Sequence, residues 1–321
     1  MKIRKFMKED LPAVVDLWNT SLGKDGKEGW YLEENLLSEE KLEKAVKGPN
    51  SDPMGIFVAC DGKKITGFGK GAVKKYKSYE DEKPGDLPGY LERLIVAPEY
   101  RRKGAGTEFL RNIESFVKAE GKDKIEISYY FPAVTGVPVL PKTPEYEFLL
   151  KKGYNPLVRE IKLRLVFRNF TLRDEIIKTR EVLRQEGIEI RYFKKGDKNS
   201  FSMLMEKYFP DWWNGFFKTN MEREKPVLIA ADGDRIAGFV GPVNVEENRR
   251  ASFAPGVDPE YRKRGIGRVL VNLWANEVKK MGAEESIIET VADNYSAQHI
   301  YFDMGFEKIG EFIGKFEKNI M

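Results

Sequence analysis

The sequence has a single cysteine, Cys60, and a single histidine, His299, among its 321 residues. This scarcity excludes an intrachain disulfide and zinc sites built from several Cys or His ligands, so we expect no metal cofactor. No run of about 18 apolar residues is present, and the N-terminal residues lack the apolar stretch of a signal peptide. These absences predict a cytoplasmic protein that does not enter the membrane.

The charge is nearly balanced, with 55 Lys and Arg against 51 Asp and Glu, a net charge of +4. A dedicated nucleic-acid-binding protein usually carries a strongly basic surface, so we expect no nucleic-acid partner. Hydrophobic residues make up 41% of the chain, which is sufficient for folded cores. A length of 321 residues suggests about two domains.

An internal repeat supports this division. Four segments of the first half recur in the same order in the second half, namely 3–10 in 190–197, 59–68 in 230–239, 96–106 in 257–267 and 152–154 in 304–306. The offset falls steadily from 187 residues (190 − 3) to 152 residues (304 − 152), as expected for a duplicated domain with longer loops in its first copy. We predict an N-terminal domain over 1–167, a connecting helix within 168–187 and a C-terminal domain over 188–321.

Each copy has the same predicted order of elements. A short strand and one or two helices precede two apolar runs joined by Asp-Gly, a strong signal for a β-hairpin because the turn needs positive φ. A third strand, a long helix, a further strand, a last helix and a final strand follow. This order predicts an α/β fold, with an α+β mixed sheet and helices on both faces, in two tandem copies.

The third strand of each copy ends in valine and leads through a basic, glycine-containing turn into the long helix. The turns span 101–106 and 262–267. The first N–H groups of a helix are unpaired, the helix dipole is positive there, and glycine lets an anion approach the backbone. We therefore predict an anion site in each copy, the alternative being a plain strand–helix turn with solvated basic residues. Neither turn has the spacing of a P-loop or of a dinucleotide-binding fingerprint.

These residues resemble the GNAT superfamily of N-acetyltransferases, which depend on acetyl-coenzyme A (acetyl-CoA). Both copies match its signature Arg/Gln-x-x-Gly-x-Gly/Ala after a strand ending in Val-x-Pro, and residues 294–306 match its second motif, Asn-x-x-Ala-x-x-x-Tyr-x-x-x-Gly-Phe. The resemblance covers nearly the whole chain as a tandem arrangement, also known in mycothiol synthase-like proteins. It implies acetyl-CoA as acyl donor and an amine as acceptor.

The resemblance also implies which residues bind the donor. A backbone N–H near Val257 would hold the thioester carbonyl, the amides of the turn would hold the pyrophosphate, and Asn294 would bond the pantetheine arm. The residues expected to contact acetyl-CoA are Val257, Arg262, Lys263, Arg264, Gly265, Ile266, Gly267, Arg268 and Asn294 in the C-terminal copy and Val96, Arg101, Arg102, Lys103, Gly104, Ala105, Gly106 and Thr107 in the N-terminal copy.

Tyr301 is the candidate general acid of the C-terminal copy, because the resemblance places it near the coenzyme A sulfur. A phenol has a pKa near 10 and an alkyl thiol one near 8.5, so a tyrosine remains protonated at neutral pH and can protonate the leaving thiolate. The alternative is an ordinary helix aromatic that packs on the core.

The N-terminal copy departs from the pattern. Leu149 and Lys142 stand where the motif has Tyr and Asn, so this half is predicted to be degenerate or regulatory. The resemblance makes Glu92 its candidate catalytic residue, because some members of the family have a carboxylate at this position that accepts the amine proton through water. The C-terminal copy has Phe253 at the matching position. The alternative for Glu92 is a surface strand residue paired with Arg93 or a lysine.

The acceptor is poorly specified by the sequence. An aromatic cluster containing Trp212, Trp213 and Phe216 could line a substrate pocket, or could be core or a domain interface. The leading hypothesis is an N-acetyltransferase that acts on a primary amine of a small molecule or peptide. A non-catalytic sensor of acyl-coenzyme A and, less favoured by the charge balance, a nucleic-acid-binding protein are the alternatives. The oligomeric state stays open.

Overall fold

The computed structural model divides the chain into two compact units. It describes residues 2–24, 29–48, 51–73, 87–128, 138–209 and 224–320. Unit 1 comprises Met1–Glu160 and Glu311–Met321, and unit 2 comprises Ile161–Gly310. The two units correspond to the two halves of the repeat except in the last strand of each half. Residues 161–167 of the first half belong to unit 2, and residues 311–321 of the second half belong to unit 1.

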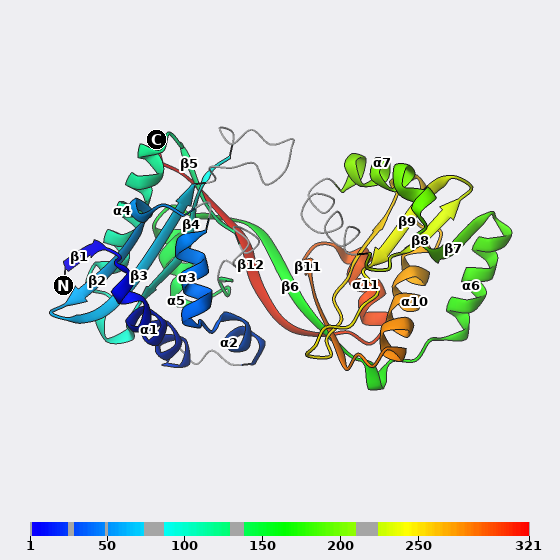
Figure 1. Cartoon of the computed structure of the whole chain (residues 1–321), viewed down its shortest axis with the longest axis horizontal. Coiled ribbons are helices and arrows are strands. Elements are labelled where there is room, and N and C mark those ends of the chain that lie inside the picture. The colour runs from blue at the N-terminus through cyan, green and yellow to red at the C-terminus, as the bar shows by residue number, and fades with distance from the viewer. Residues whose placement is uncertain are drawn as a thin grey trace. The chain divides into compact units, whose positions relative to one another are not determined.

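Unit 1 is a mixed sheet with helices on both faces (Figure 1). Its elements are β1 (Lys2–Lys5), α1 (Leu11–Lys24), α2 (Gly29–Asn35), α3 (Glu39–Lys47), β2 (Ile56–Asp61), β3 (Lys64–Val73), β4 (Gly89–Val96), α4 (Ala105–Ala119), β5 (Lys124–Ser128), α5 (Pro144–Lys151) and the start of β6 (Asn155–Val166). The strand order is β1-β2-β3-β4-β5-β12, where β12 is the last strand of the chain (Glu307–Asn319). Neighbours from β1 to β4 are antiparallel, whereas β4 and β5 are parallel.

Side-chain alternation along β3 separates the two faces of this sheet. Gly67 faces α4, where a Cβ atom would lie 2.7 Å from the ring of Phe109, so only glycine lets the helix pack this closely. The next residue, Phe68, is buried on the opposite face in one cluster with Trp18 of α1. Burial of large apolar side chains on both faces fixes the register of the strand.

Unit 2 repeats this plan. It comprises the end of β6, α6 (Asp174–Gln185), β7 (Ile188–Tyr192), α7 (Lys198–Tyr208), β8 (Leu228–Asp232), β9 (Arg235–Gly241), β10 (Ala254–Val257), α10 (Ile266–Lys280), β11 (Glu285–Val291), α11 (Tyr295–Asp303) and the start of β12 (Glu307–Asn319). Strands β10-β9-β8-β7 form an antiparallel sheet, and β11 pairs with β6. The core includes Trp274 of α10 and, in a separate cluster, Phe201 of α7.

The structure confirms the predicted fold class and the main elements of both copies. The two Asp-Gly hairpins form as expected, with Gly62 at φ +58° and Gly233 at φ +57°. Helix α6 lies inside the segment 168–187 and belongs to unit 2. None of the helices in the described ranges is long and apolar enough to cross a membrane.

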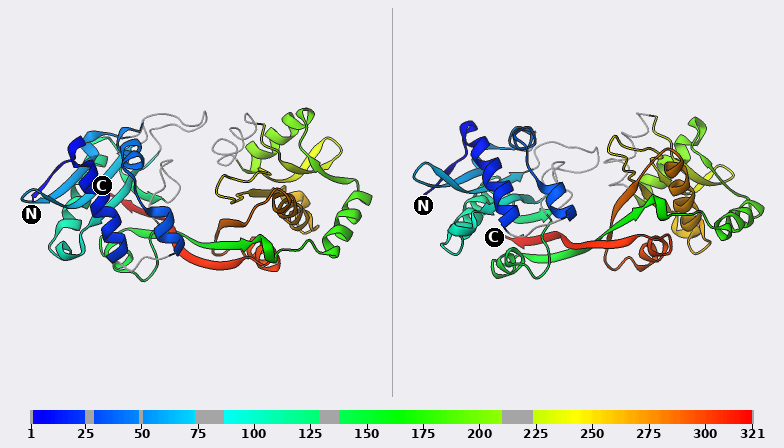
Figure 2. Two further views of the ribbon diagram at one scale, coloured as in Figure 1. Left: turned by 60° about the horizontal axis from the view of Figure 1, so that its bottom comes forward. Right: turned by 90° about the horizontal axis from the view of Figure 1, so that it is seen from below.

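The last strand of the chain completes the sheet of unit 1. Residues Lys315 to Asn319 of β12 pair antiparallel with Ser128 to Lys124 of β5, and Phe316 is fully buried in the core of that unit. Conversely, the end of β6 lies in unit 2, next to β11. The two strands β6 and β12, which run side by side in the views of Figure 2, each begin in one unit and end in the other.

The pairing of β12 with β5 predicts that a substitution near the C-terminus destabilises unit 1. Phe316→Ala should destabilise unit 1 by about 3–5 kcal/mol, the usual cost of truncating a buried phenylalanine. Hydrogen-exchange mass spectrometry should then show lost protection in β5 and retained protection in α10. Phe302→Ala, at an exposed site on α11, is the control and should change the free energy of unfolding by no more than about 0.5 kcal/mol. Loss of protection confined to unit 2 would contradict the assignment of the end of β12 to unit 1.

Candidate active site

The two glycine-containing turns have the same backbone geometry. Gly104 and Gly265 occupy the left-handed region, at φ +89° and +84°, at the N-caps of α4 and α10. Arg102 and Lys263, two residues earlier, also have positive φ, at 58° and 64°. Positive φ is cheap only for glycine, so the signature glycine is required by the turn itself. The duplicated sequence therefore builds the same local structure twice.

The first arginine of each turn fastens the turn to the preceding strand. The Nε of Arg101 donates to the carbonyl oxygen of Val96 at 2.8 Å, and the Nε of Arg262 donates to that of Val257 at 3.3 Å. The sequence analysis placed these arginines against the coenzyme phosphates. In the structure each uses the N–H of its Nε to close the turn.

The tyrosine before each of these arginines ties the turn to the hairpin. The hydroxyl of Tyr100 donates to Asp61 at 2.9 Å, and that of Tyr261 donates to Asp232 at 2.7 Å. Each aspartate belongs to the Asp-Gly pair of its own copy. The hairpin and the turn are therefore one linked structure in both units.

The opening turn of α10 presents main-chain donors beside β10 and α11. The first helical hydrogen bond at this end runs from the N–H of Val269 to the carbonyl of Gly265, at 3.0 Å. The N–H groups of the residues before Val269 have no carbonyl acceptor inside the helix. A Cβ atom at Gly267 would lie 3.4 Å from Val257 and 3.7 Å from Ile300 of α11. The free amides are thus next to the strand end and to the helix that carries Tyr301.

Two of the basic side chains expected to meet phosphate are held by acidic partners. Arg264 pairs with Glu186 at 2.6 Å, and Arg268 pairs with Glu175 at 2.9 Å and with Asp303 at 2.5 Å. Glu175 and Glu186 lie at the two ends of α6. The positive character of this turn therefore comes from the helix amides together with Arg262 and Lys263.

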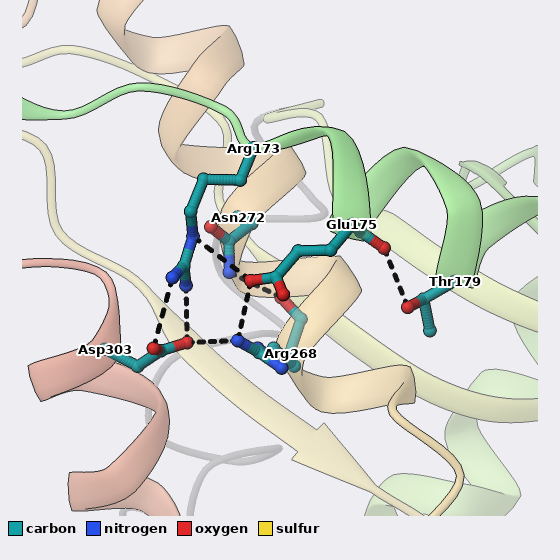
Figure 3. Close-up of polar contacts among 6 residues, drawn as sticks. All are labelled: Arg173, Glu175, Thr179, Arg268, Asn272 and Asp303. Atoms are coloured by element: carbon teal, nitrogen blue, oxygen red, sulfur yellow. Dashed lines mark hydrogen bonds and ion pairs between the residues drawn. The ribbon is translucent and has the colours of Figure 1, made fainter.

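Asp303 is the centre of a four-residue charge network that joins three helices (Figure 3). It accepts from Arg173 at 3.2 and 2.5 Å and from Arg268 at 2.5 Å, while Glu175 approaches both arginines. Hydrogen bonds from Arg173, and then from Arg268, hold the pKa of Asp303 below its usual range. The ionised carboxylate links α11 to the start of α10 through Arg268 and to the start of α6 through Arg173.

Asp303, Arg173, Glu175 and Glu186 were not identified from the sequence. They belong to no motif, and their partners are distant along the chain, so no local spacing indicates them. Thr179 of α6 makes a similar long-range approach, since a Cβ atom on Gly265 would lie 2.9 Å from its methyl group. Helix α6 therefore packs directly against the glycine of the turn.

Tyr301 is buried on α11, with 6% of its surface exposed. Its ring centroid lies 5.6 Å from that of Phe306 and 6.0 Å from that of Phe253. Burial raises the pKa of Tyr301 well above its ordinary value near 10, so the phenol is protonated throughout the neutral range. The ring thus packs on the core, as expected for an ordinary aromatic residue of a helix. The hydroxyl also keeps its proton, as a general acid requires.

Asn294 is the N-cap of α11. Its side-chain oxygen accepts from the N–H of Ala297 at 3.3 Å. The capping bond explains why an asparagine stands at this position without reference to a ligand. Its amide nitrogen remains the donor that the proposed contact with the pantetheine arm would use.

In unit 1 the candidate carboxylate Glu92 is not a surface residue. It is buried and forms an ion pair with Lys70 of β3, while the neighbouring Arg93 is also buried and lies 5.0 Å from the ring of Trp18. The alternative interpretation, a surface strand residue paired with Arg93 or a lysine, is therefore right about a lysine partner and wrong about surface exposure, while the catalytic role of Glu92 stays a prediction. Leu149, at the position of Tyr301, is a buried core residue.

The three proposed substrate residues cannot be placed. Trp212, Trp213 and Phe216 lie in 210–223, outside the described residues.

The charge network makes a prediction with a defined pH dependence. Asp303→Asn should lower the free energy of unfolding by about 1 kcal/mol at pH 7, because these partly exposed pairs share one carboxylate. The native pKa of Asp303 is lowered, so its contribution is present above the unfolded-state value near 3.9 and is lost as the pH falls through the native value. The difference between wild type and variant should therefore disappear in acid, as measured by urea unfolding.

Glu181→Gln provides the matched control on α6. Glu181 pairs with Arg184 of its own helix, at 2.7 Å, and both side chains are exposed, so this change should leave the free energy of unfolding almost unchanged at any pH. Equal effects of the two substitutions would show that Asp303 does not join the helices.

Comparisons with known proteins agree with this geometry. Residues 12–133 and 189–306 each match the acetyltransferase (GNAT) family. Human N-acetyltransferase 8 is 32% identical over 95 residues, which cover 28% of this chain and 42% of that protein. The chain thus spans less than half the length of this curated relative.

Two solved structures share the fold over their full length. A GCN5-related N-acetyltransferase from Sphaerobacter thermophilus aligns with a TM-score of 0.68 at 16% identity, covering 99% of this chain and 95% of that one. A tandem GNAT protein from the clavulanic acid biosynthesis pathway aligns with a TM-score of 0.61 at 13% identity, covering 100% and 98%. With a family match in each half, the chain belongs to the GNAT family of acetyltransferases as a tandem pair of GNAT domains.

Proposed function

We propose that this protein is an N-acetyltransferase that moves an acetyl group from acetyl-CoA to a primary amine of a small molecule or peptide. Unit 2 is the catalytic unit in this proposal. The observation that carries it is the position of the free amides at the start of α10, beside the end of β10 and beside α11 with its protonated Tyr301. The same turn in unit 1 lacks the tyrosine.

The coenzyme would be bound mainly by the main chain. Its pyrophosphate would accept hydrogen bonds from the amides of 263–268, where the helix dipole favours an anion. Arg262 and Lys263 would add full charges, whereas Arg264 and Arg268 would act through their backbone because their side chains are paired. Val257 and Asn294 would guide the thioester end along β10 and α11.

The chemistry then divides between the chain's backbone and Tyr301. A neutral amine attacks the thioester carbonyl, an N–H near Val257 stabilises the oxyanion, and the C–S bond breaks. The departing thiolate takes its proton from the phenol of Tyr301, and the tyrosinate recovers a proton from the new ammonium group or from water. Phe253 lies where unit 1 has Glu92, so unit 2 has no carboxylate at that position to take the amine proton.

Unit 1 fits the second candidate, an acyl-coenzyme A sensor. Its turn keeps the geometry that binds an anion, with Gly104 at the N-cap of α4, but the tyrosine is replaced by the buried Leu149. Binding without turnover of an external amine would make this half regulatory. The decisive experiment mixes the protein with acetyl-CoA and a panel of polyamines, aminoglycosides and peptide N-termini and follows free thiol. No thiol release above the rate of the uncatalysed mixture, despite coenzyme binding, would favour the sensor over the enzyme.

The role of Tyr301 makes the second functional prediction. Tyr301→Phe should lower kcat by about 100-fold or more, the usual contribution of a general acid, and leave the affinity for coenzyme A unchanged. Because the phenol stays protonated, the wild-type rate should not fall between about pH 7 and 9 through loss of this proton. Tyr295→Phe is the control, since Tyr295 lies on the same helix but is 73% exposed. An unchanged kcat in Tyr301→Phe would remove the general-acid role.

The amides of the two turns can be tested separately. Gly267→Asp and Thr107→Asp each place a carboxylate in the first turn of α10 or α4, where it suits the helix dipole and should preserve folding. The same charge repels a phosphate, so each variant should lose coenzyme A binding at its own site by at least about tenfold in calorimetry. Unaltered binding in both variants and in their combination would exclude the turns as the coenzyme sites.

A further inference from the structure

Lys70 of β3 and Glu92 of β4 form an ion pair inside unit 1. Their side chains are 1% and 5% exposed. Removing two charges from water is expensive, and replacing such a pair with apolar residues is often neutral or stabilising. Stability of the fold is therefore a poor explanation for a lysine and a glutamate at these positions.

The backbone directs Glu92 toward Lys70 through a β-bulge. In the pairing of β3 with β4, Lys70 faces Arg93 and Gly71 faces Leu91, so Glu92 is an extra residue in its strand. Bulges re-aim side chains and are common next to active sites. Within the described residues, one carboxylate oxygen of Glu92, Oε1, is buried without a hydrogen-bond partner. The carboxylate thus keeps an acceptor that the fold leaves unused.

The pair lies where β4 separates from β5. The parallel pairing of these strands covers Gly89 and Tyr90 against Ile125 and Glu126, whereas β4 continues along β3 as far as Val96. Glu92 is the second residue after Tyr90, the last residue of β4 that pairs with β5, and lies between that point and the glycine turn. An acyl group carried back along β4 from a coenzyme at that turn would meet this opening.

Unit 2 has no counterpart of the pair. By the repeat, Lys70 corresponds to Gly241 and Glu92 to Phe253, whose ring centroid lies 4.1 Å from that of Trp274. The same fold therefore forms without an amine or a carboxylate at these two positions. The pair is an addition particular to unit 1.

Burial favours the uncharged form of both groups. It lowers the pKa of Lys70 and raises that of Glu92, in each case as the largest effect and against their mutual attraction. Arg93, which is paired with Lys70 across the two strands, also lowers the pKa of Lys70 by charge repulsion, and it lowers the pKa of Glu92 by attraction, against the larger effect of burial. An amine is a nucleophile only when it is neutral, so this environment prepares Lys70 for attack on an acyl carbon.

We propose that Lys70 is an acetyl acceptor of unit 1, so that this unit transfers an acetyl group from acetyl-CoA to its own Lys70 Nζ. The proposal rests on the proposed function in one respect, the binding of acetyl-CoA at the turn after β4. The amine nitrogen forms a bond with the thioester carbonyl carbon and the C–S bond breaks. Glu92 first takes one proton from the Lys70 ammonium group, which leaves the neutral amine that attacks. The second proton, which the nitrogen loses as the amide forms, goes to the departing coenzyme A thiolate. The products are N-acetyl-Lys70 and free coenzyme A, and the reaction needs no external amine.

The test uses the full chain and needs no substitution. The protein is incubated with isotopically labelled acetyl-CoA, digested, and each lysine-containing peptide is quantified by mass spectrometry over time. Lys70 should take up about one acetyl group per chain, and excess coenzyme A should suppress this labelling while leaving surface lysines unaffected. Lys162 is the matched internal control, because it is also 1% exposed and pairs with a glutamate, Glu289, at 2.8 Å in unit 2. Lys162 should remain unmodified.

Two variants test the chemistry. Glu92→Gln keeps the shape of the side chain and removes the base, so labelling of Lys70 should slow by about 100-fold or more. Thr107→Asp, designed to block the coenzyme site of unit 1, should abolish labelling without touching the pair. Far-ultraviolet circular dichroism and urea unfolding verify that each variant is folded. Labelling of Lys70 at the same rate in Glu92→Gln would overturn the proposed role of the carboxylate.

Calorimetry with coenzyme A separates the failure of this proposal from that of the proposed function. Coenzyme A binding that Thr107→Asp removes, together with an unmodified Lys70 in the wild type, would overturn the self-acetylation and leave the acetyltransferase proposal standing. Absence of coenzyme A binding at both turns would overturn both proposals. Equal labelling of Lys70 and Lys162 would overturn the self-acetylation proposal, because such labelling would indicate slow chemical acetylation of buried lysines.

Discussion

The constraint on which both candidate sites depend is the left-handed glycine that ends each turn, Gly104 or Gly265, at the N-cap of a long helix. A helix can begin at this point, in this direction, only if the residue before it has positive φ, which glycine adopts without steric cost. The preceding arginine then bonds back to the valine at the strand end. The result is a rigid junction whose unpaired amides have a fixed direction, and both proposed coenzyme sites consist mainly of these amides.

Around the glycine turn of unit 2, two of the arginines in the basic sequence are already paired with carboxylates. Asp303 and Glu175 hold Arg268, and Glu186 holds Arg264, so much of the basic sequence serves to fasten helices α6 and α11 to the junction. The basic character of the signature is therefore partly architectural. The amides and the helix dipole give a positive electrostatic potential at the helix N-terminus, and a phosphate could bind there without any rearrangement of side chains.

The two units differ in the chemical groups at the positions to which the two proposals assign acyl transfer. Unit 2 has a buried, protonated Tyr301 beside its turn and an aromatic ring, Phe253, at the position of the carboxylate. Unit 1 has the carboxylate Glu92 and the amine Lys70 in contact, and a leucine at the position of the tyrosine. If both proposals hold, one half transfers acetyl groups to an external amine and the other records the supply of acetyl-CoA on its own lysine.

The sequence alone determined the features that arise from neighbouring residues: the repeat, the Asp-Gly hairpins, the glycine turns and the helices that follow them, and hence the fold class and family. Their causes are local, since φ preferences, hairpin turns and helix N-termini are set by a few consecutive residues. Only the tertiary structure decided that β12 completes unit 1, that Arg268 meets Asp303, and that Glu92 is buried against Lys70. These contacts join residues far apart in the chain, and which of many similar charged side chains come together depends on packing that no local pattern encodes.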